Sequence, residues 1–286
     1  MLCYEGKVSV FTFFTGVVFA LLPKFLFRLQ FETYALYFQS VWLTYVALYV
    51  LLNFLIVITF RGFTYQVAVR ATSLGYAFGI GILIFITAPL SWKIFGIYMS
   101  VMAMFHYSEF LAIAWTNPKA LSLDSFILNH SVEYGTAAFI SWLEFGLERY
   151  FFPWLKEPCL VSYVGLCLCI GGEILRKLAM FTARQNFNHL IQSTKAEDHQ
   201  LVTHGAYRLS RHPSYVGWFY WSIGTQLILQ NPFCTVCYTF ISWRFFQQRV
   251  LLEEMTLIKF FGRDYINYQK QTGTGLPFIS GYKFDL

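Results

Sequence analysis

The stretch that decides the fold reads YVGWFYWSIGTQLILQNPFCTVCYTFISWRFFQQRV, from Tyr215 to Val250. It consists of two apolar runs, Tyr215–Gln230 and Phe233–Val250, each close to the length of a short membrane-spanning helix. Asn231-Pro232 separates the runs and favours a turn, because a proline cannot continue the helix that precedes it. The pattern therefore predicts a tight helical hairpin whose two open ends lie on the same side of the membrane.

The composition of the whole chain is that of a membrane protein. Of its 286 residues, 57% are hydrophobic and 13% are charged, whereas a soluble domain carries roughly 25% charged residues. The apolar residues gather in runs that are long enough to cross the hydrocarbon core as helices. We expect an all-α, polytopic membrane protein with about eight transmembrane helices. Besides the hairpin, the expected spans are Val8–Leu22, Tyr34–Phe60, Ala71–Leu90, Ile94–Trp115, Val132–Phe151 and Leu160–Phe181.

By composition, the chain divides into an apolar part that is expected to lie in the membrane and a more polar part that is expected to carry the functional site. Residues 1–181 hold six of the expected spans and are predicted to form a wall in the membrane. Residues 182–286 are predicted to be the catalytic region, in which the hairpin 215–250 and the polar tail build one pocket that faces the cytosol. No cleavage pattern follows Val8–Leu22, so this run is expected to stay as a membrane helix.

Positive charges predict which side the open ends of the hairpin face. The segment before the hairpin and the tail after it hold Arg176, Lys177, Arg184, Lys195, Arg208 and Arg211, and Arg244, Arg249, Lys259, Arg263, Lys270 and Lys283. The loops expected on the opposite side hold only Lys24, Arg28, Lys93, Arg149 and Lys156. Cytosolic loops of membrane proteins are enriched in lysine and arginine, so we expect both segments to face the cytosol. The net charge of +6 suits a membrane surface, and no nucleic-acid partner is expected.

The segment before the hairpin gathers polar and aromatic residues around the start of a helix. They are Gln192, His199, Gln200, Tyr207, His212, Pro213, Ser214 and Tyr215. Pro213 suits the first helical position, where its missing N–H costs nothing. The side chains around it should therefore surround a helix N-terminus that can bind a carboxylate. The alternative is that the tyrosines and arginines only anchor the chain among lipid headgroups, a role that does not need His199, Gln200 and His212.

A second group of charged residues ends the hairpin and consists of Arg249, Glu253 and Glu254. Arg249 follows an apolar run, where a charge is costly and marks a functional position by default. Its planar guanidinium can bind a carboxylate through two hydrogen bonds. The alternative is an ion pair between Arg249 and Glu253 on one helix face, worth about 0.2–0.5 kcal/mol.

Polar residues in the earlier apolar runs have simpler explanations. His106 and Glu109 lie three residues apart in the fourth expected span, and Glu133, Glu144 and Glu148 lie along the fifth. We interpret them as hydrogen-bonded links between helices rather than as a proton relay. Cys234-x-x-Cys237 has the spacing of half a zinc site but lacks a second pair, so we expect no metal.

Longer strings in the last third of the chain are specific enough to be compared with a known family. They are Asn186-Phe187-Asn188-His189, Leu201-Val202-Thr203-x-Gly205-x-Tyr207, Arg211-His212-Pro213-Ser214-Tyr215-Val216-Gly217-Trp218-Phe219-Tyr220-Trp221, Arg249-x-x-x-Glu253-Glu254, Phe261-Gly262-x-x-Tyr265-x-x-Tyr268 and Gly275-Leu276-Pro277-Phe278. With these strings, which span roughly 187–279, the chain resembles the isoprenylcysteine carboxyl methyltransferases of animals.

The resemblance implies an endoplasmic-reticulum enzyme with several membrane spans. Such an enzyme uses S-adenosylmethionine to methylate the C-terminal prenylcysteine carboxylate of CaaX proteins, which carry a farnesyl or geranylgeranyl group. Arg249 would be the catalytic residue that holds the substrate carboxylate. The cofactor pocket would be Gln192, His199, Gln200, Leu201, Val202, Tyr207, His212, Pro213, Ser214, Tyr215 and Glu253.

The residues by themselves also suit methyl transfer to a carboxylate. Glu253 can bind the ammonium group of the cofactor, and His212 with the helix N-terminus can bind its carboxylate. A C-terminal carboxylate is already ionised at pH 7, so the reaction needs no general base.

Other functions stay open on the residues alone. A phospholipid N-methyltransferase would have no use for Arg249, because its acceptor is a neutral amine. An NADPH-dependent sterol reductase would need basic residues for the phosphates of its cofactor. A transporter would need polar residues on several spans, which the first five spans largely lack.

Overall fold

The computed structural model describes residues 1–26, 34–128 and 132–282. Over these ranges the chain forms helices and no strand, which confirms the all-α expectation. Arg28 and Lys283, which enter the charge comparison, lie outside the described residues. The side chains of residues 26–41 are likewise not described.

The described chain consists of long helices joined by short 3-10 turns. The α-helices are α1 (Tyr4–Leu26), α2 (Tyr34–Thr59), α3 (Gly62–Thr87), α4 (Leu90–Thr116), α5 (Val132–Phe151), α6 (Leu160–Ala183), α7 (Ala206–Leu209), α8 (Pro213–Leu229), α9 (Pro232–Phe261) and α10 (Arg263–Gln271). The turns are η1 (Pro118–Ala120), η2 (Leu123–Phe126), η3 (Pro153–Lys156) and η4 (Arg184–Asn186).

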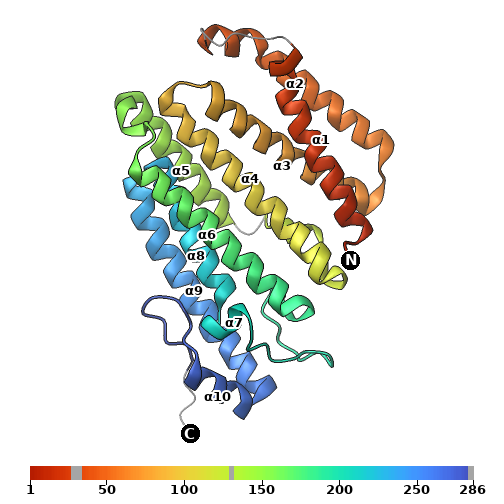
Figure 1. The fold of residues 1–286 in the computed structure, drawn as a ribbon, viewed down its shortest axis with the longest axis vertical. Helices are drawn as coiled ribbons and strands as arrows, with labels where there is room; N and C mark the ends of the chain where they lie inside the picture. The colour runs from red at the N-terminus through yellow and green to blue at the C-terminus, as the bar shows by residue number, and fades with distance from the viewer. Residues whose placement is uncertain (27–33, 129–131, 283–286) are drawn as a thin grey trace.

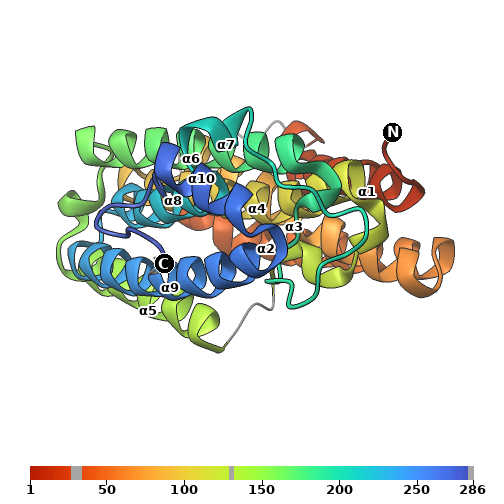
Figure 2. The ribbon, with the colours of Figure 1, turned by 90° about the horizontal axis from the view of Figure 1, so that it is seen from below.

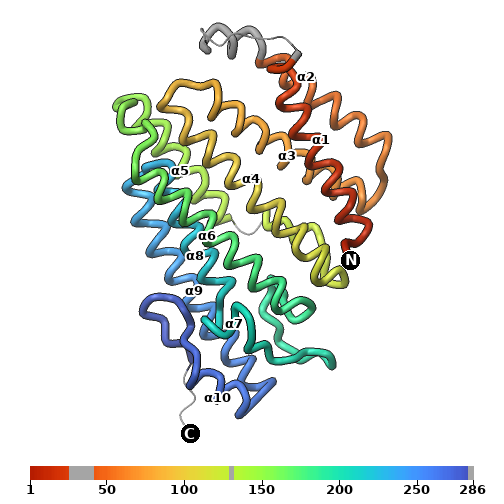
Figure 3. The backbone as a smooth tube through the Cα atoms, viewed as in Figure 1, coloured from red at the N-terminus to blue at the C-terminus, as the bar shows by residue number. Residues whose placement is uncertain are grey.

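The long helices pack side by side as two groups that share α4. One group contains α1, α2 and α3, and the other contains α5, α6, α8 and α9 (Figure 1). In the second group α8 lies between α6 and α9 (Figure 2). The segment between α6 and α7 leaves the end of α6 and returns beside the last turns of α9 (Figure 3). The ends of α6 and α9 and the start of α8 therefore meet in one region.

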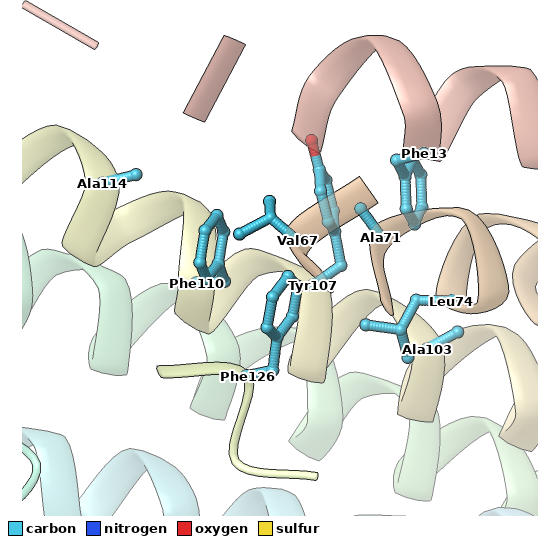
Figure 4. Packing of buried hydrophobic residues seen from close by; sticks show 9 residues of the cluster. All are labelled: Phe13, Val67, Ala71, Leu74, Ala103, Tyr107, Phe110, Ala114 and Phe126. Carbon is cyan, nitrogen blue, oxygen red and sulfur yellow. The ribbon is translucent and has the colours of Figure 1, made fainter. Parts of the chain in front are cut away.

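Stacked aromatic rings hold the first group together. Phe13 of α1 stacks on Tyr107 of α4 with ring centroids 3.8 Å apart, and Phe110 of α4 stacks on Phe126 of η2 at 4.0 Å. These residues form one buried apolar cluster with side chains of α3 (Figure 4). The cluster fixes η2 against α4, and η2 forms part of the wall of the site described below.

Glycines let α6 and α8 approach until their backbones touch. A Cβ atom added at Gly172 of α6 would lie 2.4 Å from the carbonyl oxygen of Gly217 of α8. Gly165 and Gly224 make the same kind of contact two turns away, at 2.7 Å. Small residues commonly allow such close packing in membrane helices, where burial in lipid supplies no drive for helices to associate. The contact fixes the start of α8 against the end of α6.

The predicted hairpin is present, and its turn is anchored by a buried lysine. Lys156 of η3 donates to the carbonyl oxygens of Leu229 and Gln230, both at 2.9 Å, and to Oδ1 of Asn231 at 3.0 Å. Its ammonium also lies 2.5 Å from Glu148. The ammonium therefore binds the backbone carbonyls at the end of α8.

A second glutamate of α5 also serves the hairpin. Glu144 accepts hydrogen bonds from the backbone N–H groups of Phe233 and Cys234, both at 2.8 Å, and so caps the start of α9. His106 of α4 bonds to the carbonyl oxygen of Phe126 and to the Tyr134 hydroxyl, at 3.0 and 3.1 Å. These contacts support the interpretation of hydrogen-bonded links between helices for Glu144 and His106.

The number of membrane spans is only partly tested by the helices. Five of the described helices, α1, α2, α3, α4 and α6, are long and apolar enough to cross a membrane. α8 has only 17 residues, and α5 and α9 carry several charged side chains. α5 and α9 nevertheless expose large apolar side chains along their outer faces, such as Trp142 and Phe240. The count of eight spans stays a prediction.

Helix boundaries differ from the expected spans where polar residues continue a helix. α3 begins at Gly62 rather than at Ala71 and so includes Arg70. α9 continues past Val250 to Phe261. Arg176, which the charge comparison assigned to a surface segment, lies inside α6 with 2% of its surface exposed. This position of Arg176 agrees with the expected span Leu160–Phe181, where Glu109 compensates its buried charge.

The contact between α6 and α8 predicts a position-specific effect of added methyl groups. Gly172→Ala should lower the melting temperature, because overpacking of this kind typically costs about 1–3 kcal/mol. Gly171→Ala is the matched control, since a Cβ atom there meets no other atom within 4 Å. Thermal unfolding in detergent measures both variants. Equal melting temperatures for the two would contradict the contact.

Candidate functional site

Two adjoining cavities lie where the ends of α6 and α9 meet the start of α8. The larger has a volume of about 640 Å³ and reaches from η2 to Arg249. The smaller lies between the α6–α7 segment and the last turns of α9. Tyr207, Tyr215 and Glu253 line both cavities, so the two form one site.

The structure brings together all of the residues predicted for the site. Gln192, His199, Gln200, Leu201 and Val202 line the smaller cavity. His212, Pro213, Ser214 and Arg249 line the larger one. The location of the predicted residues at one end of the helix bundle follows from the hairpin, which returns α9 to the level at which α8 starts (Figure 1).

The α6–α7 segment is fixed on the end of α9. Lys195 donates to the carbonyl oxygen of Phe260 at 3.1 Å, and its ammonium lies 4.5 Å from the centre of the Phe261 ring. The His199 ring packs edge-on against both phenylalanines. Burial and the nearby charge of Lys195 lower the pKa of His199, which favours a neutral imidazole facing the cavity.

Glu254 organises the start of α8 and the tail. Its carboxylate is completely buried and accepts hydrogen bonds from Arg211 at 2.7 Å, His212 at 3.1 Å and Tyr265 at 3.1 Å. Gln269 and the backbone N–H of Tyr282 donate to its second oxygen. Burial alone would raise the pKa of Glu254, but His212 and Arg211 lower it below its usual value. No pattern in the sequence indicated this role, because Glu253 and Glu254 are simply two adjacent acidic residues at the end of the hairpin.

Arg249 and Glu253 do not form the ion pair that their spacing allows. The Tyr215 hydroxyl lies between them: it donates to Glu253 at 2.5 Å and accepts from Nε of Arg249 at 3.3 Å. The carbonyl oxygen of His189 accepts a hydrogen bond from Nη2 of Arg249 at 2.9 Å. Among the described residues, no carboxylate lies within 4 Å of the Arg249 guanidinium. Its charge is therefore available to an anionic ligand.

His212 makes more contacts with other residues of the protein than the sequence predicts. Its ring stacks parallel to Tyr215, with Nε2 3.1 Å from Glu254 and Nδ1 3.7 Å from Glu253. The N–H groups of Tyr215 and Val216 both donate to the carbonyl oxygen of His212. At most the Ser214 N–H of the first turn is left for a ligand. The predicted binding of a cofactor carboxylate by His212 stays a prediction, and the two nearby carboxylates do not favour it.

A buried ion cluster beneath the site was not predicted. Arg176 of α6 binds both oxygens of Glu109 of α4, at 2.7 and 2.8 Å, and donates to the Ser214 hydroxyl at 2.5 Å. Lys177 and His189 also donate to Glu109. Glu109 does not pair with His106, although the two lie three residues apart on α4. Arg176 was the available signal, because a charge inside an apolar helix marks either a site or a partner.

Comparison with known proteins identifies the same part of the chain. The isoprenylcysteine carboxyl methyltransferase family model matches residues 164–259. A protein-S-isoprenylcysteine O-methyltransferase of Tribolium castaneum is 51% identical over 290 residues, which cover 99% of this chain and 100% of that protein. The Homo sapiens protein of that name is 54% identical over 244 residues, which cover 85% of this chain and 86% of that protein.

A solved structure has the same fold. It is described as the eukaryotic intramembrane Ras methyltransferase isoprenylcysteine carboxyl methyltransferase. The TM-score is 0.93 at 49% sequence identity, and the match covers 99% of this chain and 100% of the other. The matched fold therefore includes the helices that carry the two cavities.

The buried Glu254 predicts a pH-dependent effect of its substitution. Its pKa is lower in the folded protein than in the unfolded chain, so ionised Glu254 stabilises the fold above the unfolded pKa. This stabilisation is lost as the pH falls through the folded pKa. Glu254→Gln should therefore lower the melting temperature at pH 7, and the difference from wild type should shrink only below about pH 4.3, the pKa of an ordinary glutamate in an unfolded chain, as the pH falls towards the lower folded pKa.

Differential scanning fluorimetry from pH 7 down to about pH 3, below the pKa of an ordinary glutamate, measures the difference. Glu197→Gln, in the exposed part of the α6–α7 segment, is the control and should behave as the wild type. A deficit of Glu254→Gln that is constant from neutral to acid pH would contradict the prediction.

Proposed function

Because the chain belongs to the isoprenylcysteine carboxyl methyltransferase family, we propose that it transfers a methyl group from S-adenosylmethionine to the C-terminal carboxylate of a prenylated cysteine. The acceptors are CaaX proteins that carry a farnesyl or geranylgeranyl group. The observation that carries the proposal is Arg249, a cation that lines the larger cavity and has no carboxylate partner among the described residues.

The side chains of the smaller cavity fit S-adenosylmethionine. Glu253 is about one-third exposed and offers a carboxylate to the ammonium group of the cofactor. Leu201, Val202 and Phe261 offer apolar contact to the adenine, and Gln200 offers an amide. When bound, the cofactor supplies an electrophilic methyl group on a sulfonium. The remaining predicted cofactor residues line the same cavities and are proposed as contacts: Gln192, His199, Tyr207, His212, Pro213, Ser214 and Tyr215.

The acceptor carboxylate needs orientation rather than activation. An α-carboxyl group has a pKa of about 3.3–3.7 and is ionised at neutral pH. Arg249 would hold one face of this carboxylate, and the Tyr215 hydroxyl beside it keeps Glu253 from neutralising Arg249. When the carboxylate and the methyl group are held in line, they need not meet by diffusion in the correct orientation, and this lowers the barrier to reaction. The chain thus contributes binding, orientation and exclusion of water.

The location of the site suits an acceptor with a lipid tail. The cavities lie at one end of the apolar helices, so a prenyl group can stay in the bilayer while its carboxylate reaches Arg249. We propose that this end faces the cytosol and that the membrane is the endoplasmic reticulum, as the distribution of positive charge and the resemblance imply. A phospholipid N-methyltransferase or a sterol reductase is not favoured, because relatives that match 85–99% of this chain are named protein-S-isoprenylcysteine O-methyltransferase.

An acceptor comparison tests the proposed reaction. The purified protein is incubated with S-adenosylmethionine labelled in its methyl group and with N-acetyl farnesylcysteine, phosphatidylethanolamine or no acceptor. Label should enter the farnesylcysteine as a base-labile methyl ester, because a carboxylate is the nucleophile. Label that enters only phosphatidylethanolamine would contradict the proposal.

The guanidinium of Arg249 should be needed for the acceptor and not for the cofactor. Arg249→Ala should lower turnover of farnesylcysteine by at least about 100-fold, since a misplaced reacting group costs that much. Binding of S-adenosylmethionine, measured by calorimetry, should persist. Arg244→Ala is the matched control, because Arg244 is exposed on the same helix and lies outside both cavities. Near-normal turnover of Arg249→Ala would exclude the proposed role of Arg249.

A further inference from the structure

Glu109 is a completely buried carboxylate that the proposed reaction does not use. It lies on α4 and belongs to the part of the chain that was expected to act only as a wall. A buried carboxylate is retained only when donors and opposite charges compensate the loss of water. Its partners therefore show what it holds in place.

The partners of Glu109 come from two different parts of the chain. Arg176 and Lys177 belong to α6 and provide two positive charges close to the carboxylate. The third partner, Nε2 of His189 at 2.8 Å, belongs to the segment that lines the larger cavity. Arg176 and Lys177 already compensate the negative charge of Glu109. The contact with His189 therefore serves to hold in place the segment that contains His189.

The backbone of His189 in turn holds Arg249. Its carbonyl oxygen accepts a hydrogen bond from Nη2 of Arg249 at 2.9 Å, which is shorter than the 3.3 Å contact of Nε with the Tyr215 hydroxyl. Both acceptors are uncharged, so they fix the direction of the guanidinium without neutralising it. A carboxylate in either place would compete with an anionic ligand.

The peptide around His189 has few other restraints. It follows the short turn η4, and the next helix, α7, begins only at Ala206. Phe187 is buried, and its carbonyl oxygen accepts a hydrogen bond from Asn117 at 3.3 Å. Beyond it, Leu190 is exposed. The Leu190 N–H, which belongs to the same peptide as the His189 carbonyl, donates to Oδ1 of Asn188 at 3.1 Å. This local turn and the imidazole contact with Glu109 together orient the carbonyl oxygen that Arg249 uses.

We propose that Glu109 and His189 are positioning residues for the methyl acceptor. Glu109 holds the His189 imidazole, and the carbonyl oxygen of His189 then directs the Arg249 guanidinium toward the place of the acceptor carboxylate. This inference rests on the proposed function, in which Arg249 binds that carboxylate. It assigns to α4 a part in acceptor binding, although no residue of α4 touches either cavity.

Variants of His189 test the inference, because its side chain is partly exposed and its loss leaves the buried Arg176 pair intact. His189→Leu should raise the KM for farnesylcysteine about 10-fold, the effect of losing one hydrogen bond to a charged group. The affinity for S-adenosylmethionine and the melting temperature should stay near wild type. His189→Gln retains an amide N–H donor and should recover most of the lost affinity. His204→Leu, an exposed histidine of the same segment, is the control.

A double-mutant cycle supplies the second measurement. Glu109→Gln weakens the contact with His189, because a neutral amide oxygen replaces the carboxylate, and should raise the same KM. His189→Leu should then raise this KM by less in the Glu109→Gln background than in the wild type, because the two substitutions act on one contact. Independent, additive effects would contradict the inference. So would a normal KM for His189→Leu, or a failure of His189→Gln to recover affinity. If His189→Leu lowered the affinity for S-adenosylmethionine and the melting temperature as well as the affinity for farnesylcysteine, the role of His189 would be only structural.

The outcome for Arg249→Ala separates this inference from the proposed function. If Arg249→Ala is inactive while His189→Leu is normal, the acceptor clamp stands and the positioning role is wrong. If Arg249→Ala keeps near-normal turnover, the clamp itself is wrong, whatever the His189 variants show. If farnesylcysteine is not methylated at all by the wild type, the proposed function fails before either variant is measured.

Discussion

The ammonium of Lys156, buried beneath the turn between α8 and α9, holds in place the two helices that carry both halves of the site. It binds carbonyl oxygens at the end of α8 and the side chain of Asn231, while Glu144 caps the start of α9. The turn cannot slip along the helix axes without leaving these groups unpaired in an apolar setting, which is costly. The distance between His212 and Glu253, at the far end of the hairpin, follows from this anchor and from the close contact of α6 with α8.

Buried charge is handled in two ways at the site. Glu109 and Glu254 are completely buried, and each carboxylate is surrounded by donors that include an arginine. Removing either partner of such a pair would leave the other charge buried without water, so both pairs also stabilise the fold. Arg249 differs from Arg176 and Arg211 in that only neutral oxygens hold it. A cation that is fixed but not compensated is suited to bind an anion, and the surrounding pairs keep it in that state.

The helices before α6 contribute more than a wall in the membrane. The stacked rings of Phe110 and Phe126 fix η2, which lines the larger cavity. Glu109, the residue next to Phe110 in α4, reaches the cluster beneath the start of α8. The family model matches only residues 164–259, yet the site also depends on contacts from the first half of the chain. The division into residues 1–181 and residues 182–286 therefore describes how the composition changes along the chain. It does not describe which parts of the chain hold the site together.

The family resemblance supplied cavity-lining residues such as Leu201 and Val202. The sequence by itself determined the helical class, the hairpin at Asn231-Pro232 and the grouping of polar residues on either side of the hairpin. These features follow from local rules: apolar runs of spanning length, a proline that ends a helix, and polar residues grouped along the chain. Only the tertiary structure decided that Arg249 bonds to the backbone of His189 instead of pairing with Glu253. It also decided that Arg176 is buried against Glu109. Such pairings join residues that are far apart in the chain, and they depend on how closely helices such as α6 and α8 approach, which no local pattern records.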